Sequence, residues 1–478
     1  MLEQVELRGL FLQRVDGDPN WFRYHQLFAE FLRRRIERDD PDRIQWLHRA
    51  ASQWFTDHAY VNEAVDHALA AGDPHGALDL VEQDETKLLE QSKMTTLLGV
   101  VNKLPPQLVV SRPRLQLHIA WANVLLQRPD RASAALDRFE AALRRAGTSV
   151  SEGSDLRAEA NVVRAVAAMF ADRLQSLDDL IAEALSRPDS LPPRVAGVAG
   201  IVAAFAAIYR FDFGAAHRHL QWAAPYQEMM RPFARVYARC FGGIAARQQL
   251  DVPAALKNFR AALEIAATVG PHSHAVRLAG ALLGELLYET GELNEAERRL
   301  DESYRLGSDG GGVDYLAARY LTCARIKAAQ GDRACGRAAN GRDGGGAAVE
   351  AARLAAAITN ERIRLGFEIA PAVAARLRSP RTTARDDGIA TFTAELDENS
   401  GIRLLSSSDS ADERDQACRR AAELLGGINA ARRPLAALGA HILLAQTLAA
   451  TGRPADTDVA VRCTKLGLPG LLADTGLG

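Results

Sequence analysis

Few side chains in this sequence are arranged for catalysis. No G-x-x-x-x-G-K-[ST] run occurs along the 478 residues, so no P-loop is predicted for nucleotide phosphates. A kinase glycine loop, H-R-D and D-F-G are also missing, and "ARDDGIA" at 384–390 shares only letters with the last of these. Because phosphoryl transfer needs several such parts together, we predict no catalytic residue and no enzyme activity in this chain.

The histidines and cysteines form no metal-binding pattern. We interpret His272 and His274 of "PHSHA" as loop residues, and predict no metal site and no cofactor in the chain. The cysteines are dispersed without a C-x-x-C pair: Cys240, Cys323, Cys335, Cys418 and Cys463. Such a set is typical of buried thiols in a reducing compartment, so we expect a cytoplasmic protein.

One group of side chains suits ligand binding. Tyr288, Tyr315, Arg319 and Tyr320 fall on helices that we expect to line the concave face of a repeat array. Aromatic rings beside a guanidinium can bind a sugar, a peptide or an acidic ligand. We therefore predict that this face binds a protein partner or a small effector. Packing within the core is the alternative, because tyrosine at helical spacing is common there.

The overall composition narrows the class of protein. The formal net charge is -2 and the pI is about 6.6, which argues against direct nucleic-acid binding, since that function needs a basic surface. No apolar run approaches the roughly 18–20 residues that cross a bilayer, so no membrane span is predicted. At 47% hydrophobic residues, the chain can form a sizeable core.

The elements that must position these side chains are paired helices. In residues 278–306, Leu278, Leu282 and Leu286 lie on one helical face, Gly291 interrupts the pattern, and a second amphipathic helix follows. Related small or apolar anchors recur about forty residues apart, at Ala135, Leu177, Ala216, Ala255 and Ala296. This repeat predicts an all-α fold, a TPR-like α-solenoid in which stacked helical hairpins bury one another's apolar faces.

Three segments stand out from the repeat. The Gly-rich stretch 335–357 lacks helix propensity, which is consistent either with a locally shifted reading frame or with a loop inserted near a site. Within 379–402, "GIATFTAEL" is the one plausible short strand. Helix is expected to resume after Ser410, which with Glu413 forms a capping box.

The N-terminal part resembles a known family. "GLFLQRVDGDPNWFRYHQLFAEFLRRRI", followed by "LHRAASQWFTDHAYVNEAVDHALAAGDPHGALDLVE", is similar to the end of the ATPase module and the helical arm of MalT/LuxR-type signal-transducing ATPases. The resemblance implies that "GLFLQR" and "WFRYH" are winged-helix strands and that "HQLFAEFLRRRI" is the last helix of that domain. It also implies that the chain opens inside a winged-helix domain, with ATP bound by domains that precede it.

Within this family, the resemblance extends along nearly the whole chain. "EQSKMTTLL", "WAAPYQEMM", "LLYETGEL", "VDYLAARY" and "DDGIATFTAELDENS" are similar to the C-terminal part of serine/threonine-protein kinases that carry a MalT-like region. We accordingly predict a partial winged-helix domain at 1–40, a helical arm at 41–110 and TPR-like sensor repeats at 111–334. The aberrant stretch 335–357 and C-terminal helical repeats at 358–478 follow.

The resemblance also singles out one histidine. "YHQLFAEF" matches the winged-helix motif whose histidine can reach the bound nucleotide, which implies nucleotide sensing by His25, with Arg23 as a weaker companion, once an ATPase domain is present. The alternative is that His25 simply packs against the helix or caps it.

The function predicted from the sequence is a non-catalytic regulatory, sensor and protein-interaction module, and a truncated gene product is one interpretation of it. Two alternatives remain open: a fragment of a MalT/LuxR-type transcriptional regulator without its DNA-binding domain, and a free-standing TPR-like scaffold.

Overall fold

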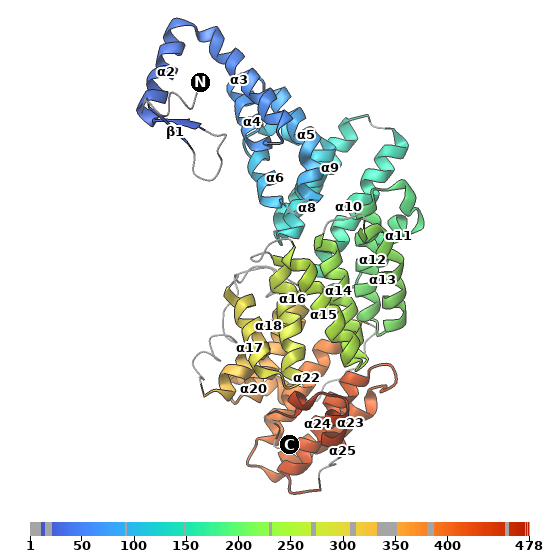
Figure 1. Cartoon of the computed structure of the whole chain (residues 1–478). Coiled ribbons are helices and arrows are strands. Elements are labelled where there is room, and N and C mark those ends of the chain that lie inside the picture. Colours follow the sequence, from blue (N-terminus) through green and yellow to red (C-terminus); the bar gives the residue numbers. More distant parts are fainter. Residues whose placement is uncertain are drawn as a thin grey trace. The chain divides into compact units, whose positions relative to one another are not determined.

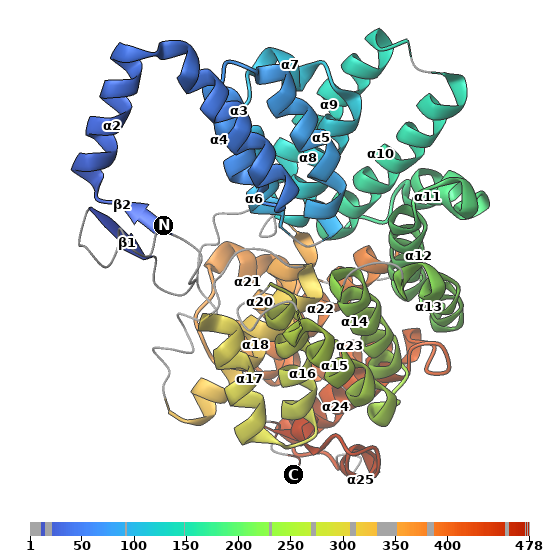
Figure 2. The same ribbon diagram turned by 45° about the horizontal axis from the view of Figure 1, so that its top comes forward.

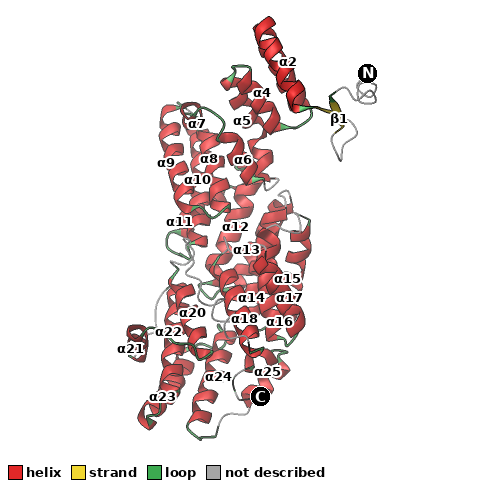
Figure 3. Cartoon of the chain, turned by 90° about the vertical axis from the view of Figure 1, so that its left-hand side faces the viewer, coloured by secondary structure: helices red, strands yellow, loops and turns green. Residues whose placement is uncertain are grey.

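The structure is a computed structural model. It describes residues 11–14, 22–90, 93–147, 149–228, 232–268, 274–305, 312–331, 351–379, 387–454 and 458–473, with 475 and 477. This part of the chain is helical apart from one β-hairpin near its start (Figure 3), which confirms the predicted all-α repeat fold and is consistent with a winged-helix segment before it. None of the described helices is long and apolar enough to span a bilayer.

The chain divides into two compact units. The first is Met1–Leu89, Lys93–Ile119 and Arg138–Ala146, and the second is the remainder, so that the division falls within α8 (Pro113–Leu125) and α9 (Pro129–Arg145). The other elements of the first unit are β1 (Leu12–Arg14), β2 (Phe22–Tyr24), α2 (Gln26–Asp39), α3 (Pro41–Asp57), α4 (Val61–Ala70), α5 (Pro74–Glu90), α6 (Met94–Val101) and α7 (Pro106–Val110).

The first unit begins with the two strands that the resemblance implied. β1 and β2 pair antiparallel, with Leu12 opposite Tyr24 and Arg14 opposite Phe22. The phenyl ring of Phe28 in α2 stacks on Phe11 with the ring centroids 5.1 Å apart. Next along the chain, α3 and α4 form a hairpin in which the hydroxyl of Ser52 donates to the carbonyl of Ala64 at 2.9 Å.

The second unit is a stack of helical hairpins. Its elements are α10 (Val150–Phe170), α11 (Leu177–Ser186), η1 (Pro188–Ser190), α12 (Pro193–Ile208), α13 (Phe213–Glu228), α14 (Pro232–Gln248), α15 (Val252–Ala267), α16 (His274–Glu289), α17 (Leu293–Arg305), α18 (Val313–Ala329), α20 (Ala352–Arg364), α21 (Pro371–Arg378), α22 (Gly388–Ser406), α23 (Ala411–Gly427), α24 (Pro434–Ala450), α25 (Asp458–Lys465) and η3 (Pro469–Leu472).

The even-numbered helices from α10 to α24 form one layer of this unit. Each of them contacts the next even-numbered helix, and Figures 1 and 2 show α14, α16 and α18 side by side. The helices α11, α13, α15 and α17 pack on their preceding partners as the second members of hairpins. This is the arrangement expected of an α-solenoid.

The predicted anchors of the second helices are fully buried. Each of the five has 0% exposed surface: Ala135, Leu177, Ala216, Ala255 and Ala296. Glycines on the facing first helices make room for the partner helix, because a methyl group at Gly243 would lie 2.3 Å from Cε1 of Phe259. Gly291 adopts φ +86° between α16 and α17, as its role as a helix break requires.

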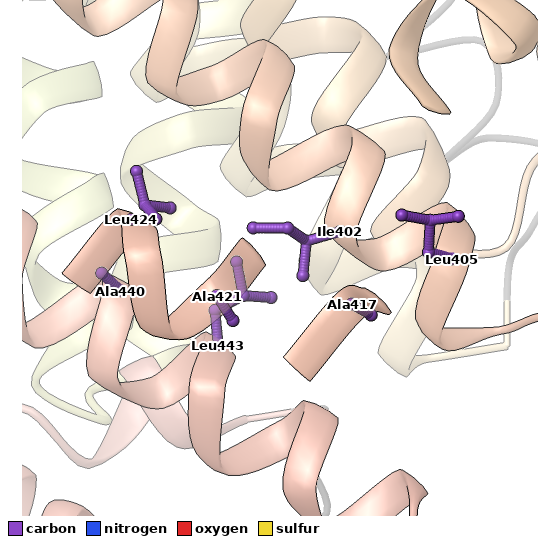
Figure 4. Packing of buried hydrophobic residues seen from close by; sticks show 7 residues of the cluster. All are labelled: Ile402, Leu405, Ala417, Ala421, Leu424, Ala440 and Leu443. Atoms are coloured by element: carbon purple, nitrogen blue, oxygen red, sulfur yellow. The ribbon is translucent and has the colours of Figure 1, made fainter. Parts of the chain in front are cut away.

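The C-terminal hairpins have a core of their own (Figure 4). Ile402 and Leu405 of α22 pack with Ala417 and Leu424 of α23 and with Leu443 of α24. The hydroxyl of Ser410 accepts a hydrogen bond from the Glu413 amide at 3.4 Å, which confirms the predicted N-terminal cap of α23.

Two local predictions were wrong. "GIATFTAEL" lies in α22 and is not a strand, since the Asp387 carboxylate caps the helix by accepting from the amides of Ile389 and Ala390 at 2.8 and 3.2 Å. We also expected no helix within 335–357. Helix α20 nevertheless begins at Ala352, because Leu354 and Ala357 are buried in the core. The remainder of the aberrant stretch, 335–350, lies outside the described residues.

Candidate functional site

The hairpin and α2 place Arg23 and His25 at a helix N-terminus. Arg23 lies on β2, and His25 is the N-cap residue of α2. The backbone amide of His25 donates to the carbonyl of Phe11 at 2.6 Å, which fixes the junction of strand and helix. The imidazole is exposed and makes no capping hydrogen bond, so the alternative that His25 caps the helix is not what the structure shows.

This placement leaves both side chains available to a ligand brought by another domain. A helix N-terminus carries partial positive charge, and an imidazole or guanidinium beside it can donate to phosphate oxygens. The structure contains no nucleotide, so the sensing role of His25 and Arg23 stays a prediction.

The predicted aromatic group on α16 and α18 is mostly buried. Tyr288, Tyr315 and Arg319 are 3%, 1% and 1% exposed, while Tyr320 is partly exposed. A guanidinium nitrogen of Arg319 donates to the Tyr315 hydroxyl at 3.2 Å, and the Arg319 guanidinium lies 5.1 Å from the centroid of the Tyr320 ring. Tyr315, Arg319 and Tyr320 thus contact one another along α18, and Tyr288 is buried in α16. Ligand binding by the group stays a prediction.

A buried polar cluster that the sequence analysis missed lies in the second unit. We call it the Arg353 cluster: Asp172, Tyr209, Asp314 and Arg353. The Arg353 guanidinium donates to both oxygens of Asp172, at 2.8 and 2.6 Å, and to Oδ1 of Asp314 at 2.9 Å. It also donates to the Tyr209 hydroxyl at 2.9 Å, while that hydroxyl donates to Asp314. All donors and acceptors of the cluster thus face one another.

Local structure brings the four residues together from four places in the chain. Asp172 follows α10 in a turn with φ +57°, and Tyr209 ends α12. Asp314 and Arg353 lie in the first turns of α18 and α20. A carboxylate is favoured at a helix N-terminus, which explains the position of Asp314.

Burial and charge act in opposite directions on the two carboxylates. Burial raises the pKa of Asp172, and the nearby Arg353 charge only partly offsets it. Burial also acts to raise the pKa of Asp314, but the Arg353 charge together with hydrogen bonds from Arg353 and Tyr209 lowers it overall. The cluster therefore depends on Arg353 as the cation that balances the buried Asp172 and the partly buried Asp314.

A small apolar cavity adjoins the cluster. Phe205, Tyr237, Phe241 and Leu278 contribute to its lining, and Asp314 is its one charged lining residue. Its volume of about 20 Å³ suffices for roughly one water molecule and not for an organic ligand.

Further buried ion pairs link the even-numbered helices. Glu159 of α10 accepts from the Trp121 indole at 2.8 Å and from Arg194 of α12 at 2.6 Å. Arg325 of α18 holds Glu361 of α20 through two hydrogen bonds of 2.9 and 2.7 Å. Similar pairs join α14 to α16 and α22 to α23 and α24: Arg247 with Glu289, Arg420 with Glu398, and Arg433 with Glu395.

No metal centre is found in the part of the chain that the structure describes. No group of three or more His, Cys, Asp or Glu side chains there could hold an ion. Cys240, Cys418 and Cys463 are buried free thiols, Cys323 is also buried, and Cys335 lies outside the described residues.

Comparisons with known proteins agree with this architecture. Residues 1–44 match the family described as the MalT winged helix domain. The whole chain is 62% identical to the serine/threonine-protein kinase PknK of Mycobacterium tuberculosis and to that of Mycobacterium bovis, and covers 43% of those proteins. It is 34% identical to the HTH-type transcriptional regulator MalT of Serratia proteamaculans over 38% of this chain and 20% of that protein.

The chain thus spans less than half the length of the curated relatives that it matches, and it is similar to their MalT-like C-terminal region. No solved structure matches it.

Proposed function

We propose that this chain, similar along its whole length to the MalT-like C-terminal part of the PknK kinases, is a non-catalytic sensor and interaction module. It would couple the binding of a protein partner or small effector to kinase and ATPase activity in an attached region. The observation that carries the proposal is the 62% identity over the entire chain, joined to a MalT winged-helix match at its start. We further propose that the module acts in the cytoplasm, and the free thiols of Cys240, Cys418 and Cys463 support this.

The fold supports such a role. Helical repeats present long surfaces built from many hairpins, and they bind peptides, proteins and small molecules in other proteins. Buried ion pairs between successive even-numbered helices fix their packing, so a ligand that favours another packing would act on several hairpins together.

His25 and Arg23 would be the contact to nucleotide in the attached region. The support is geometric, since both side chains are exposed at the N-terminus of α2 and the His25 imidazole is not used as a cap. ATP or ADP would be held by domains that the relatives carry outside the matched region.

The test is an exchange of the matching region in PknK of Mycobacterium tuberculosis. Autophosphorylation would be compared among natural PknK, PknK without its C-terminal 43%, and PknK in which this chain replaces that region. The proposal predicts that the exchanged protein behaves like natural PknK and that the shortened protein differs from both. Equal activity in all three would refute a regulatory role.

A second set of proteins isolates the role of His25. ADP retention by the exchanged protein should fall with His25→Ala and should be unaffected by His58→Ala, a change of another exposed histidine at a helix end. Equal retention in both variants would assign His25 to packing alone.

The similarity to MalT favours one other function, the control of transcription through a DNA-binding partner. Co-purification with promoter DNA only in the presence of such a partner would support it. Regulation of PknK activity in the exchange experiment would support the kinase-linked role.

A further inference from the structure

Large apolar side chains are exposed mainly near the start of the described chain. Of the ten that the structure leaves exposed in its described part, eight lie between Phe11 and Tyr60, and the other two are Leu293 and Val461. Exposed apolar side chains that gather in one region mark an interaction surface more often than a chance arrangement. The first unit therefore presents apolar surface that its own described elements do not cover.

Two tryptophans of this set lie on one face of α3. Trp46 is 62% exposed and Trp54 is 45% exposed, and Leu47 beside them is 40% exposed. Positions 46, 50 and 54 follow at four-residue spacing, and Ala50 is exposed as well. The other face of α3 packs on α4, where Ser52 is buried. We call Trp46, Leu47, Ala50 and Trp54 the α3 surface.

The indole of Trp54 is held in a fixed orientation. Its ring stacks on His58 with the centroids 3.9 Å apart, and it is within 7° of parallel to the ring of Tyr60. A large aromatic side chain that is already ordered loses little conformational entropy when a partner covers it. Such residues commonly contribute most of the binding energy at the centre of an interface.

Positive charge borders the α3 surface. Arg43 and Arg49 lie three residues to either side of Trp46 and are therefore its neighbours on the helix. Both are exposed, and neither forms an ion pair with a side chain that the structure describes. The nearby carboxylate of Asp57 already accepts from Gln53 at 2.9 Å. A complementary partner would thus present an apolar patch edged with carboxylates.

We infer that the α3 surface is the docking site for the attached region of PknK-like proteins, which would contact it through an apolar patch edged with carboxylates. The inference rests on the proposed function, because it names the surface through which this chain would reach the region that it regulates. Neither His25 nor the aromatic group on α16 and α18 takes part.

The position of the α3 surface in the chain favours this occupant. It begins two residues after the winged-helix match, which covers residues 1–44. The matched part is 43% of PknK, so the larger part of that protein lies outside it. A region joined covalently near this surface has an effective concentration of the order of millimolar, which a free second copy of the chain lacks.

Hydroxyl-radical footprinting with mass spectrometry tests the docking site, because it reports the solvent exposure of single side chains. The whole chain alone would be compared with the exchanged PknK. Oxidation of Trp46 and Trp54 should fall about threefold in the exchanged protein, since the centre of an interface excludes solvent. Leu293 and Val461, at 52% and 51% exposure, should be oxidised equally in both proteins.

A pair of variants of the exchanged PknK shows whether the protection depends on the α3 surface. Trp46→Glu places a negative charge in its apolar centre and should restore the oxidation of Trp54 to the rate in the isolated chain. Leu293→Glu, at an exposed apolar position of α17, should leave Trp54 protected. Because both positions are exposed, neither change should shift the Tm of the isolated chain by more than about 2 °C.

Two results would overturn the inference. One is equal oxidation of Trp46 in the isolated chain and in the exchanged PknK. The other is protection of Trp46 already in the isolated chain, which would assign the surface to a second copy if it rises with protein concentration and to another part of the same chain if it does not.

The autophosphorylation assay gives an independent result. Protection of Trp46 and Trp54 in an exchanged PknK whose autophosphorylation does not depend on this chain would support docking and refute regulation. Dependence of autophosphorylation on this chain without protection of the tryptophans would refute docking at the α3 surface alone.

Discussion

Nη2 of Arg353 donates to Oδ1 of Asp172 at 2.6 Å, and so joins two positions that are 181 residues apart in the sequence. The same guanidinium holds Asp314 and Tyr209, so the turn after α10 and the end of α12 are tied to the starts of α18 and α20. A helical repeat usually contacts only its neighbours along the chain. In this protein a buried cation also connects hairpins that are several repeats apart.

Replacing that cation should cost a large part of the stability. We predict that Arg353→Met lowers the free energy of unfolding of the second unit by about 3 kcal/mol, since the buried Asp172 and the partly buried Asp314 would both lose their counter-ion. Urea unfolding followed by circular dichroism measures the change. Arg419→Met, at an exposed arginine, should stay within about 0.5 kcal/mol of the unsubstituted chain. A loss below about 1 kcal/mol for Arg353→Met would contradict the role of the cluster.

The hairpin of α3 and α4 should be sensitive to pH. Nδ1 of His48 and Nδ1 of His67 are 2.8 Å apart, so one ring must donate and the other accept. Burial and His48 lower the pKa of His67 below 6.5, while Asp66 and Glu63 oppose this shift. Because the unfolded chain binds the proton more readily, this stability is complete above pH 6.5 and is lost as the pH falls through the lowered value.

Hydrogen exchange of peptides that cover residues 48–67 measures this effect. Protection should fall as the pH drops below 6.5 in the unsubstituted chain and should vary much less in His67→Gln. His75→Gln, at an exposed histidine of α5, should retain the pH dependence. Identical pH profiles for the unsubstituted chain and His67→Gln would show that the pair does not control this hairpin.

The close approach of paired helices can be tested with two glycines. A methyl group at Gly243 would lie 2.3 Å from the Phe259 ring, whereas one at Gly439 would meet no atom within 4 Å. Gly243→Ala should therefore destabilise the chain by about 1–3 kcal/mol. Gly439→Ala, within α24, should stabilise it by about 0.5–1 kcal/mol because alanine restricts the unfolded chain. Denaturation midpoints that move in the same direction would contradict the described packing.

The contact between α22 and α12 gives a further prediction. A methyl group at Gly388 would lie 1.5 Å from the carbonyl oxygen of Tyr209. Gly388→Ala should thus separate the start of α22 from the end of α12 and expose the rings of Phe211 and Phe392, now 5.4 Å apart. Limited proteolysis should show faster cleavage near residue 387 in this variant than in Gly426→Ala, whose position is open. Equal cleavage rates would show that the contact is dispensable.

The repeat architecture was predictable because its signals are local and periodic. Ala255 and Ala296 recur at the repeat spacing and are fully buried, and Gly291 has the positive φ that its break between helices required. The hairpin before α2 was also recovered, but from resemblance to a family and not from strand periodicity.

The polar interior was not predictable in the same way. Arg353 lies in a stretch that seemed unfit for helix, and its partners Asp172 and Tyr209 are 181 and 144 residues away. Nothing periodic connects such positions, and a lone arginine normally indicates an exposed face. "GIATFTAEL" was misassigned for a related reason, since packing of α22 and the Asp387 cap outweigh its β-branched residues.

We propose that this chain changes the activity of an attached region and performs no phosphoryl transfer itself. The most direct measurement is ATP hydrolysis by the isolated chain and by PknK in which this chain replaces the matching region, with and without Arg353→Met. We predict no hydrolysis by the isolated chain, natural activity in the exchanged protein and altered activity when Arg353 is replaced. Hydrolysis by the isolated chain, or exchanged proteins that behave like PknK lacking the region, would contradict the claim.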